Sequence, residues 1–172
     1  MKKISFAAIL ILASTVLFSY ALAQSEEFEK IGRKHFDNAF FKAVPQKNKA
    51  RVVAEFALAE KAFQKAIQKK PHRVDAYLHL GRTYHVQKKY IAAARIYRSA
   101  LVIAPQKEKI YLRLASALEK AGDYRGAIST LEKLRAQVTD ERAIRVLDGF
   151  IDKMEVRAAR TDPDKSQSGE LP

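Results

Sequence analysis

Hydrophobic positions recur along the middle of the chain with a period of 34 residues. The aromatic residues Phe56, Tyr90 and Tyr124 keep this spacing, and further small and apolar residues follow each of them in the same order. Within a period the apolar residues are three or four positions apart, which predicts amphipathic helices and not strands. The residues that share the register are Ala59, Ala93 and Ala127, then Phe63, Tyr97 and Leu131, then Ala66, Ala100 and Leu134.

The same pattern predicts where individual helices begin and end. Pro45, Pro71 and Pro105 end three of them, because proline cannot donate a backbone hydrogen bond and disfavours helix in the residue before it. Asp140 is the expected N-cap of the last helix, since a carboxylate at that position accepts hydrogen bonds from the first turn. The predicted helices cover residues 26–44, 50–69, 74–86, 90–103, 108–120, 124–138 and 140–159.

Self-similarity at this period is typical of an array of antiparallel helix pairs. A single pair cannot bury its outer apolar stripe, so its stability depends on stacking against a neighbour. We therefore expect an all-α fold, a short α-solenoid of about three repeats with a capping helix at each end. The expected core of the best-defined repeat consists of Tyr77, Leu80, Gly81, Tyr84, Ala93, Tyr97, Ala100 and Pro105.

The register breaks at both ends of the array. Gly32 lies 49 residues before Gly81, which is 15 more than one period. Either the first repeat carries an insertion around Pro45, or residues 26–44 form a separate capping helix. At the other end Gly149 keeps the register, but Arg145 and Asp148 replace an aromatic residue and a leucine of the repeat core. A polar final helix is what a terminal cap needs.

Residues 74–105 resemble a tetratricopeptide repeat. The pattern of that family, an aromatic residue, Leu-Gly, Tyr, Ala, an aromatic residue, Ala and Pro, is filled by the eight core residues named above. Residues 108–139 match more weakly but in register, and the first unit matches only in its second helix. The resemblance covers about residues 50–155 and implies a binding fold without chemistry of its own.

Some members of this family hold the C-terminal carboxylate of a partner in a two-carboxylate clamp. Lys109 and Arg113 match the lysine and arginine that the clamp takes from its third repeat. The other positions differ, because His79 stands where the family has asparagine, and Glu29 and Arg33 replace a lysine and an asparagine. The resemblance therefore implies a partial clamp.

The first 23 residues are expected to form a signal peptide. Lys2 and Lys3 precede an apolar run over residues 4–20, and Ala21 and Ala23 occupy the small-residue positions before a cleavage site. We expect cleavage after Ala23 and a periplasmic or secreted mature chain. An uncleaved membrane anchor is the alternative, because the run nearly reaches spanning length. The chain has no cysteine, which excludes disulfides and a lipoprotein anchor.

These patterns divide the chain into four parts. Residues 1–23 are the signal peptide, 24–49 an N-terminal helix and basic linker, and 50–160 the repeat domain with its C-terminal capping helix. Residues 161–172 are polar and contain proline, serine and glycine, so a disordered tail is expected there.

Positive charge is concentrated in the repeats. The whole chain carries a formal net charge of +13, and residues 42–120 hold 18 Lys and Arg against 5 acidic residues. A concentrated positive field favours an acidic partner or surface. The alternative is a solvated basic face that only keeps the protein soluble.

The first helices of stacked pairs line a concave face. We expect a basic groove there, with Leu78 and Leu112 as an apolar floor, that binds an acidic peptide or protein. The predicted groove residues are His79, Arg82, His85, Lys109, Leu112, Arg113, Ser116 and Lys120.

Motifs for chemistry are missing from the sequence. It contains no Gly-rich phosphate loop, no cysteine pair and no nucleophile motif, and no two of its four histidines have the spacing of a helical metal site. We expect no catalysis, no cofactor and no metal. The favoured function is a protein-interaction scaffold of the cell envelope. The alternatives are a binder of an anionic polymer or surface (cell-wall glycan, acidic lipid or nucleic acid) through residues 42–120, and an accessory subunit of an enzyme.

Nucleic acid is the least favoured of these partners. Its recognition as a single strand uses exposed aromatic side chains interleaved with basic ones. Here the aromatic residues of the repeats occupy core positions instead.

Overall fold

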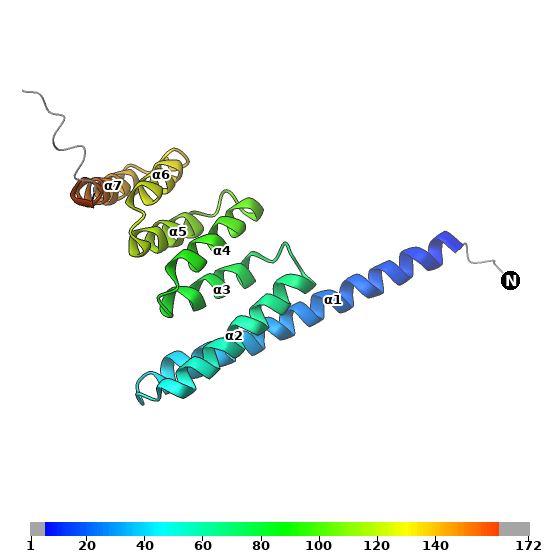
Figure 1. Cartoon of the computed structure of the whole chain (residues 1–172). Coiled ribbons are helices and arrows are strands. Elements are labelled where there is room, and N and C mark those ends of the chain that lie inside the picture. The colour runs from blue at the N-terminus through cyan, green and yellow to red at the C-terminus, as the bar shows by residue number, and fades with distance from the viewer. Residues whose placement is uncertain (1–5, 162–172) are drawn as a thin grey trace, which may run out of the picture. The chain divides into compact units, whose positions relative to one another are not determined.

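The computed structural model describes residues 6–161, and within them every regular element is a helix (Figure 1). The prediction of an all-α fold built from antiparallel helix pairs is confirmed for this part of the chain. Residues 162–172 of the expected tail and the first five residues of the expected signal peptide lie outside it, and Thr161, expected in the tail, is the last residue of α7. The helices are α1 Phe6–Asp37, the π-helical η1 Asn38–Ala43, α2 Lys49–Lys69, α3 Val74–Val86, α4 Tyr90–Ile103, α5 Glu108–Ala121, α6 Tyr124–Arg135 and α7 Glu141–Thr161.

The chain divides into two compact units, Met1–Thr83 and Tyr84–Pro172, with the boundary inside α3. In the first unit the N-terminal part of α1 extends past the end of α2 (Figure 1). Its apolar side chains Val16, Leu17, Phe18 and Tyr20 are exposed. No helix among residues 6–161 is both long enough and apolar enough to cross a membrane.

The core of the first unit is the pairing of α1 with α2. A Cβ at Gly32 would lie 2.6 Å from Cε1 of the Phe63 ring, so only glycine lets the two helices approach this closely. The rings of Phe36 and Phe56 meet edge to face with centroids 5.7 Å apart. Residues 26–44 therefore pack against α2 as the first helix of this pair, which favours the alternative of a first repeat with an insertion around Pro45.

The 15 extra residues lengthen both helices of this hairpin. η1 continues α1 by six residues, and α2 begins at Lys49, seven residues before the register position Phe56. Each helix thus gains about two turns. The Asn48 side chain closes the hairpin by accepting a hydrogen bond of 3.0 Å from the Arg51 backbone N–H.

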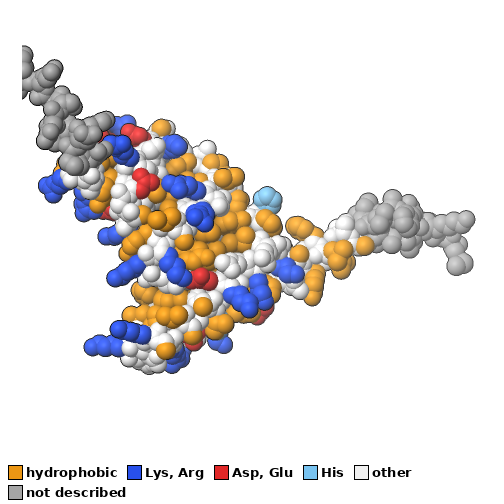
Figure 2. All heavy atoms as spheres, viewed as in Figure 1, with side chains coloured by type: hydrophobic (Ala, Val, Ile, Leu, Met, Phe, Trp, Pro, Cys, Tyr) orange, Lys and Arg blue, Asp and Glu red, His pale blue; other side chains and the backbone are white. Residues whose placement is uncertain are grey.

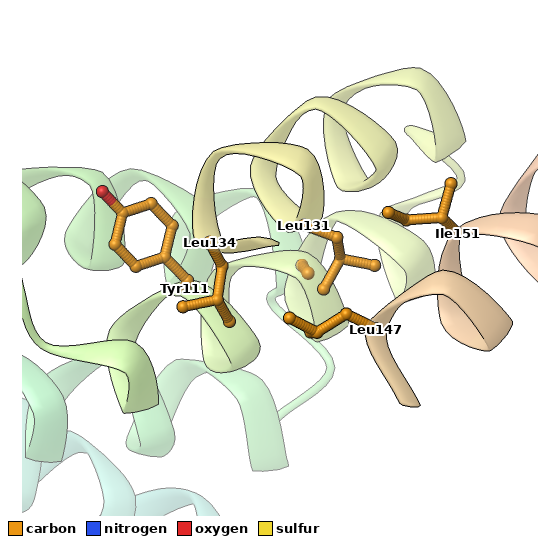
Figure 3. Packing of buried hydrophobic residues seen from close by; sticks show 6 residues of the cluster. Tyr111, Leu131, Leu134, Leu147 and Ile151 are labelled. Atoms are coloured by element: carbon orange, nitrogen blue, oxygen red, sulfur yellow. The ribbon is translucent and has the colours of Figure 1, made fainter. Parts of the chain in front are cut away.

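The second unit is built around an apolar cluster from α5, α6 and α7 (Figure 3). Tyr111 and Leu134 lie together at one end of it, and the Tyr111 hydroxyl accepts a hydrogen bond of 2.8 Å from Gln137 Nε2. These contacts join three successive helices into one core. The buried residues of the cluster are Tyr111, Ala115, Leu131, Leu134, Leu147 and Ile151.

Three residues at the turns of the second unit cap the helices beside them. Gly122 ends α5 in the left-handed conformation at φ 83°, which a residue without Cβ adopts freely. Asp123 then caps α6 through the Gly126 backbone N–H at 2.9 Å. Asp140 accepts from the Ala143 backbone N–H at 2.8 Å, so the predicted N-cap of α7 is confirmed.

Replacing Asp140 with alanine should lower the free energy of unfolding by about 1 kcal/mol, because the first turn of α7 loses its side-chain acceptor. Chemical denaturation monitored by helical circular dichroism measures this. Asp140→Asn is the matched control, since an amide oxygen caps nearly as well. Equal losses in the two variants would show that the cap is not the cause.

The last helix keeps the period in sequence but not in packing. A Cβ at Gly149 would meet nothing within 4 Å, and the residue is exposed, because no second helix of a pair follows α7 among the described residues. Asp148 forms an ion pair with Arg135 of α6, and Arg145 pairs with Glu141 at 3.7 Å. Asp148 therefore ties α7 to α6, while Arg145 is exposed on α7.

Candidate functional site

One face of α5 carries most of the predicted groove residues of the second unit. Lys109, Leu112, Arg113, Ser116 and Lys120 are three or four positions apart, so they share one side of the helix. Lys109 and Lys120 are exposed and Leu112 is 45% exposed. Arg113 and Ser116 are half-buried. This face offers both cationic groups and an apolar side chain to a ligand.

A cavity of about 320 Å³ opens beside these residues, between α5, α6 and α7. Leu112 and Ser116 belong to its wall, which is mainly apolar. Sequence reasoning missed the contributions of α6 and α7, although Phe150 and Met154 are four positions apart on one face of the last helix, a spacing that could have revealed them. The wall consists of Leu112, Ala115, Ser116, Glu119, Ala127, Leu131, Phe150 and Met154.

Glu119 is the acidic residue of this wall. Its carboxylate accepts a hydrogen bond from Arg157 Nη1 of α7, which also forms the ion pair between the two helices. The negative charge in the cavity is thus compensated internally. An acidic group of a ligand near Glu119 is therefore repelled less strongly than the sequence alone suggests.

Arg113 and Lys120 lie close enough to His85 to affect its protonation. Burial lowers the pKa of His85, and the positive charges of Arg113 and Lys120 lower it further. The His85 ring also meets Tyr90 edge to face at 5.2 Å. At neutral pH His85 is therefore a neutral, partly buried group of this cluster.

The guanidinium of Arg113 has an unmet hydrogen-bonding capacity. Its Nε is buried and has no acceptor. A buried donor without a partner costs about 1–3 kcal/mol, so such groups usually have a ligand or a neighbour to satisfy them. Arg113 is consequently a residue of α5 with a side-chain donor left to satisfy.

The other predicted groove residues lie in the first unit and are bound within it. The His79 ring stacks on Phe63 with centroids 5.3 Å apart, and its Nε2 lies 3.7 Å from Glu29 Oε1. The Arg82 guanidinium lies 4.5 Å from the centre of the Phe36 ring. Both side chains therefore have packing roles. Leu78, predicted to be exposed on the floor, is buried instead, which leaves Leu112 as the exposed leucine of the two.

Burial is the main reason that the pKa of His79 lies below its ordinary value of 6.5. The charges of Arg33 and Arg82 act in the same direction, whereas Glu29 and Asp75 oppose it. The unfolded chain binds this proton more readily than the folded one. The stability contribution of a neutral His79 is therefore complete above pH 6.5 and decreases as the pH falls below that value.

A buried ion pair ties α1 to the segment before α3. Glu29 is 3% exposed, and its carboxylate accepts a hydrogen bond from Arg73 Nε. Arg73 also reaches Glu26 at 3.2 Å, and Arg33 lies 4.0 Å from Glu29. Burial disfavours the charge of Arg73, but its hydrogen bonds to Glu29 and Glu26 outweigh this and raise its pKa.

This pair changes the interpretation of the clamp positions. Glu29 stands where the clamp has lysine. Its carboxylate is bound by Arg73, and the negative charge of Glu29 would repel the carboxylate of a partner. Residues 29 and 73 are too far apart in sequence for the pattern to have revealed their contact.

Among the described residues, no group of three or more His, Cys, Asp or Glu could hold a metal ion.

The predicted repeat-core residues differ in burial. Leu80, Gly81, Ala93, Tyr97 and Ala100 are buried. Tyr77 and Tyr84 are half-buried, and Pro105 is exposed in the turn between α4 and α5. The small residues thus occupy the tightest positions, while two of the aromatic rings keep one edge in solvent.

Comparisons with known proteins agree with this architecture. Two family models described as tetratricopeptide repeat match residues 50–108 and 87–147, and together they span more than half of the chain. No curated protein matches the sequence significantly.

Several solved structures have the same fold. The TPR2B domain of yeast Sti1, in a complex with pHsp70, superposes with a TM-score of 0.60 at 19% identity, covering 78% of this chain and 98% of that one. The TPR domain of Arabidopsis OM64 gives 0.56 at 16% identity, with 77% and 98% covered. The Yersinia enterocolitica type III secretion chaperone SycD, bound to a peptide of the translocator YopD, gives 0.55 at 17% identity, with 79% and 95% covered.

Proposed function

Because the chain belongs to the tetratricopeptide repeat family over residues 50–147, we propose that it is a non-catalytic scaffold that binds a protein or peptide partner. Two of the structural neighbours, yeast Sti1 and SycD, carry peptide or protein ligands in their complexes, which supports this class of function. The family motifs include no catalytic group, and the proposed role involves no reaction.

The observation that carries the proposal is that Arg113 lies on α5 next to Leu112 and one turn from Ser116, two residues of the apolar cavity wall. A guanidinium with an unsatisfied Nε favours a carboxylate or carbonyl acceptor, and the cavity favours an apolar side chain. The ligand chemistry that fits both is a peptide segment with an acidic group a few residues from a hydrophobic one. Lys109 and Lys120 add positive charge at the exposed part of the same face.

The proposed location is the cell envelope, after cleavage behind Ala23. The support is the sequence of the first 23 residues. Mass spectrometry of the chain recovered from its own cells tests this: a mature N-terminus at Gln24 is the expected result, and an intact Met1 would favour an anchored protein.

A crosslinking experiment should identify the partner and locate its binding face. A photoreactive residue at Ser116, in the wall of the cavity, should capture the partner in the intact envelope. The same group at Val102 of α4, which is 85% exposed, is the control for random encounters. Capture of the same proteins from both positions would contradict a groove on α5.

Removing the two charges of the groove should weaken binding of the captured partner. The variant Lys109→Gln with Arg113→Gln keeps the aliphatic stems but loses charge-assisted hydrogen bonds, so we expect the affinity to fall on the order of tenfold or more. Calorimetry with the purified partner measures this. Arg98→Gln with Lys133→Gln, two exposed residues of the same unit, is the charge-matched control. Equal affinities of both double variants would end the proposal.

A second function is favoured by a different feature of the same unit. A hollow of about 550 Å³ is lined by Lys88, Lys89, Arg95 and Lys120 and by no acidic residue. An anionic polymer would fit such a surface. Binding of a polymer should decrease steeply with salt concentration because counterions are released, whereas an apolar peptide contact should lose less.

A further inference from the structure

The residues added to the first hairpin lie beyond the register positions of the repeat. We call residues 38–54 the hairpin tip: η1, the loop after it and the start of α2. The register positions Gly32, Phe56 and Phe63 already close the helix pair without these turns. Ala39 and Ala43 pack inside the hairpin, but among the described helix pairs this one alone has the extension, and its outward-facing side chains have no counterpart in the repeats.

The tip exposes large apolar side chains to solvent. Phe41 is 62% exposed and Val53 is 68% exposed, and Phe40 and Val44 are also exposed. Burial of each of these side chains would contribute favourable free energy in proportion to the apolar area removed from water. Four such groups at the free end of one hairpin form a patch that a soluble monomer rarely keeps without a use.

The aromatic rings of the patch are held in place by contacts with the core. Phe36 is buried, and its ring stacks on Phe40 with centroids 5.8 Å apart. Phe40 in turn meets Phe41 edge to face at 5.1 Å. The exposed rings therefore form a fixed column that starts in the core, and little conformational freedom is lost when the tip binds.

The charges around the patch all have one sign. Lys42, Lys47, Lys49 and Arg51 are exposed, and residues 38–54 contain no acidic residue. Figure 2 shows basic and hydrophobic side chains next to each other at the end of this hairpin. The acidic residues that border the tip are Asp37, which is exposed, and Glu55.

Glu55 is bound to His35 and Arg51. Its carboxylate lies 2.7 Å from Nδ1 of His35 and 4.0 Å from Nε of Arg51. The hydrogen bond from His35 is the main cause that lowers the pKa of Glu55. This carboxylate stays ionised at neutral pH, and its charge is offset by that of Arg51, which leaves the positive charges of Lys42, Lys47 and Lys49 at the tip.

We propose that the hairpin tip docks on an anionic lipid surface. Phenylalanine and valine side chains at a convex end can enter the boundary between headgroups and acyl chains, while lysines alongside them keep their amines among the lipid phosphates. Anionic lipids attract such basic groups additively. A protein ligand would instead need a matching concave surface for this convex tip. The proposal does not depend on the proposed function, because the α5 groove uses other residues in the other unit.

The test uses the full chain and a single tryptophan as a local probe, since the sequence contains none. Phe41→Trp reports the environment of the tip, and Val102→Trp, on α4, is the matched control. With vesicles of phosphatidylglycerol, tryptophan emission of the tip variant should shift to the blue, and that of the control should not. Attachment of the N-terminal apolar segment alone would shift neither. Vesicles of phosphatidylcholine should give little shift at the tip.

Charge reversal completes the test. Adding Lys42→Glu and Lys49→Glu to the Phe41→Trp chain should weaken its partition onto phosphatidylglycerol on the order of tenfold or more, because two attractive charges become repulsive. Any of three outcomes would overturn the proposal. These are no emission shift at the tip, an equal shift for Val102→Trp, or a shift of the same size on phosphatidylglycerol and phosphatidylcholine vesicles. A tip shift caused by soluble polyglutamate but not by vesicles would also overturn it, in favour of an acidic protein partner.

Discussion

Replacing Arg73 with alanine should lower the free energy of unfolding by about 3 kcal/mol, because the buried carboxylate of Glu29 would lose its main partner. Removing one member of a buried pair costs far more than the pair itself contributes, since the remaining charge stays in a poorly solvating environment. Arg33, at 4.0 Å, is too distant and too exposed to replace the lost hydrogen bond. Chemical denaturation measures the loss, and hydrogen exchange should locate it in α1 and α2.

Two variants separate this cause from others. Glu29→Gln combined with Arg73→Ala should recover part of the lost stability, because it removes the uncompensated charge. Arg98→Ala breaks an exposed ion pair with Asp123 at 4.0 Å and should cost under about 1 kcal/mol. A double variant no more stable than Arg73→Ala would mean that lost packing, and not the buried charge, explains the effect.

Replacing Gly32 with alanine should cost about 2 kcal/mol, because the new methyl group would overlap the Phe63 ring. Three atoms of that ring lie 2.6, 2.7 and 2.8 Å from the Cβ position. The ring cannot move aside cheaply, since Phe63 is fully buried and His79 stacks on it. A thermal melt together with chemical denaturation of the full chain measures the change.

Gly149→Ala is the matched control, and it should have the opposite sign. Both glycines are helical, but a Cβ at Gly149 meets nothing within 4 Å. Alanine there should stabilise α7 by about 0.5–1 kcal/mol through its better helix propensity. If Gly32→Ala also stabilised the protein, the close approach of α1 to α2 would be disproved.

Much of the fold could be predicted from sequence because the information is local and periodic. The 34-residue register places α3 at residues 74–86 and α4 at 90–103, the bounds that the structure has. Asp140 could be recognised as an N-cap because its partner, Ala143, is three residues away. Prolines and apolar spacing placed the later helices to within a few residues, but the predicted start of the first helix at residue 26 is wrong, because α1 begins at Phe6 and runs through that position without a break.

The candidate site could be predicted from the sequence only in part. The charged residues of α5 follow from the register, since positions three and four apart share one side of a helix. The cavity beside them does not, because α6 and α7 supply half of its wall and α7 departs from the repeat pattern. The exposed aromatic column of the hairpin tip was hidden in an apparent break of the period.

The sequence by itself determined the helices, their register and the family to which the array belongs, because each of these depends on contacts between residues a few positions apart and on one repeating spacing. Tertiary structure decided the rest. It packed α1 against α2, joined Glu29 to Arg73 and left Gly149 open. These outcomes depend on which segments meet across distances of tens of residues, and a periodic pattern contains no information on contacts that occur only once.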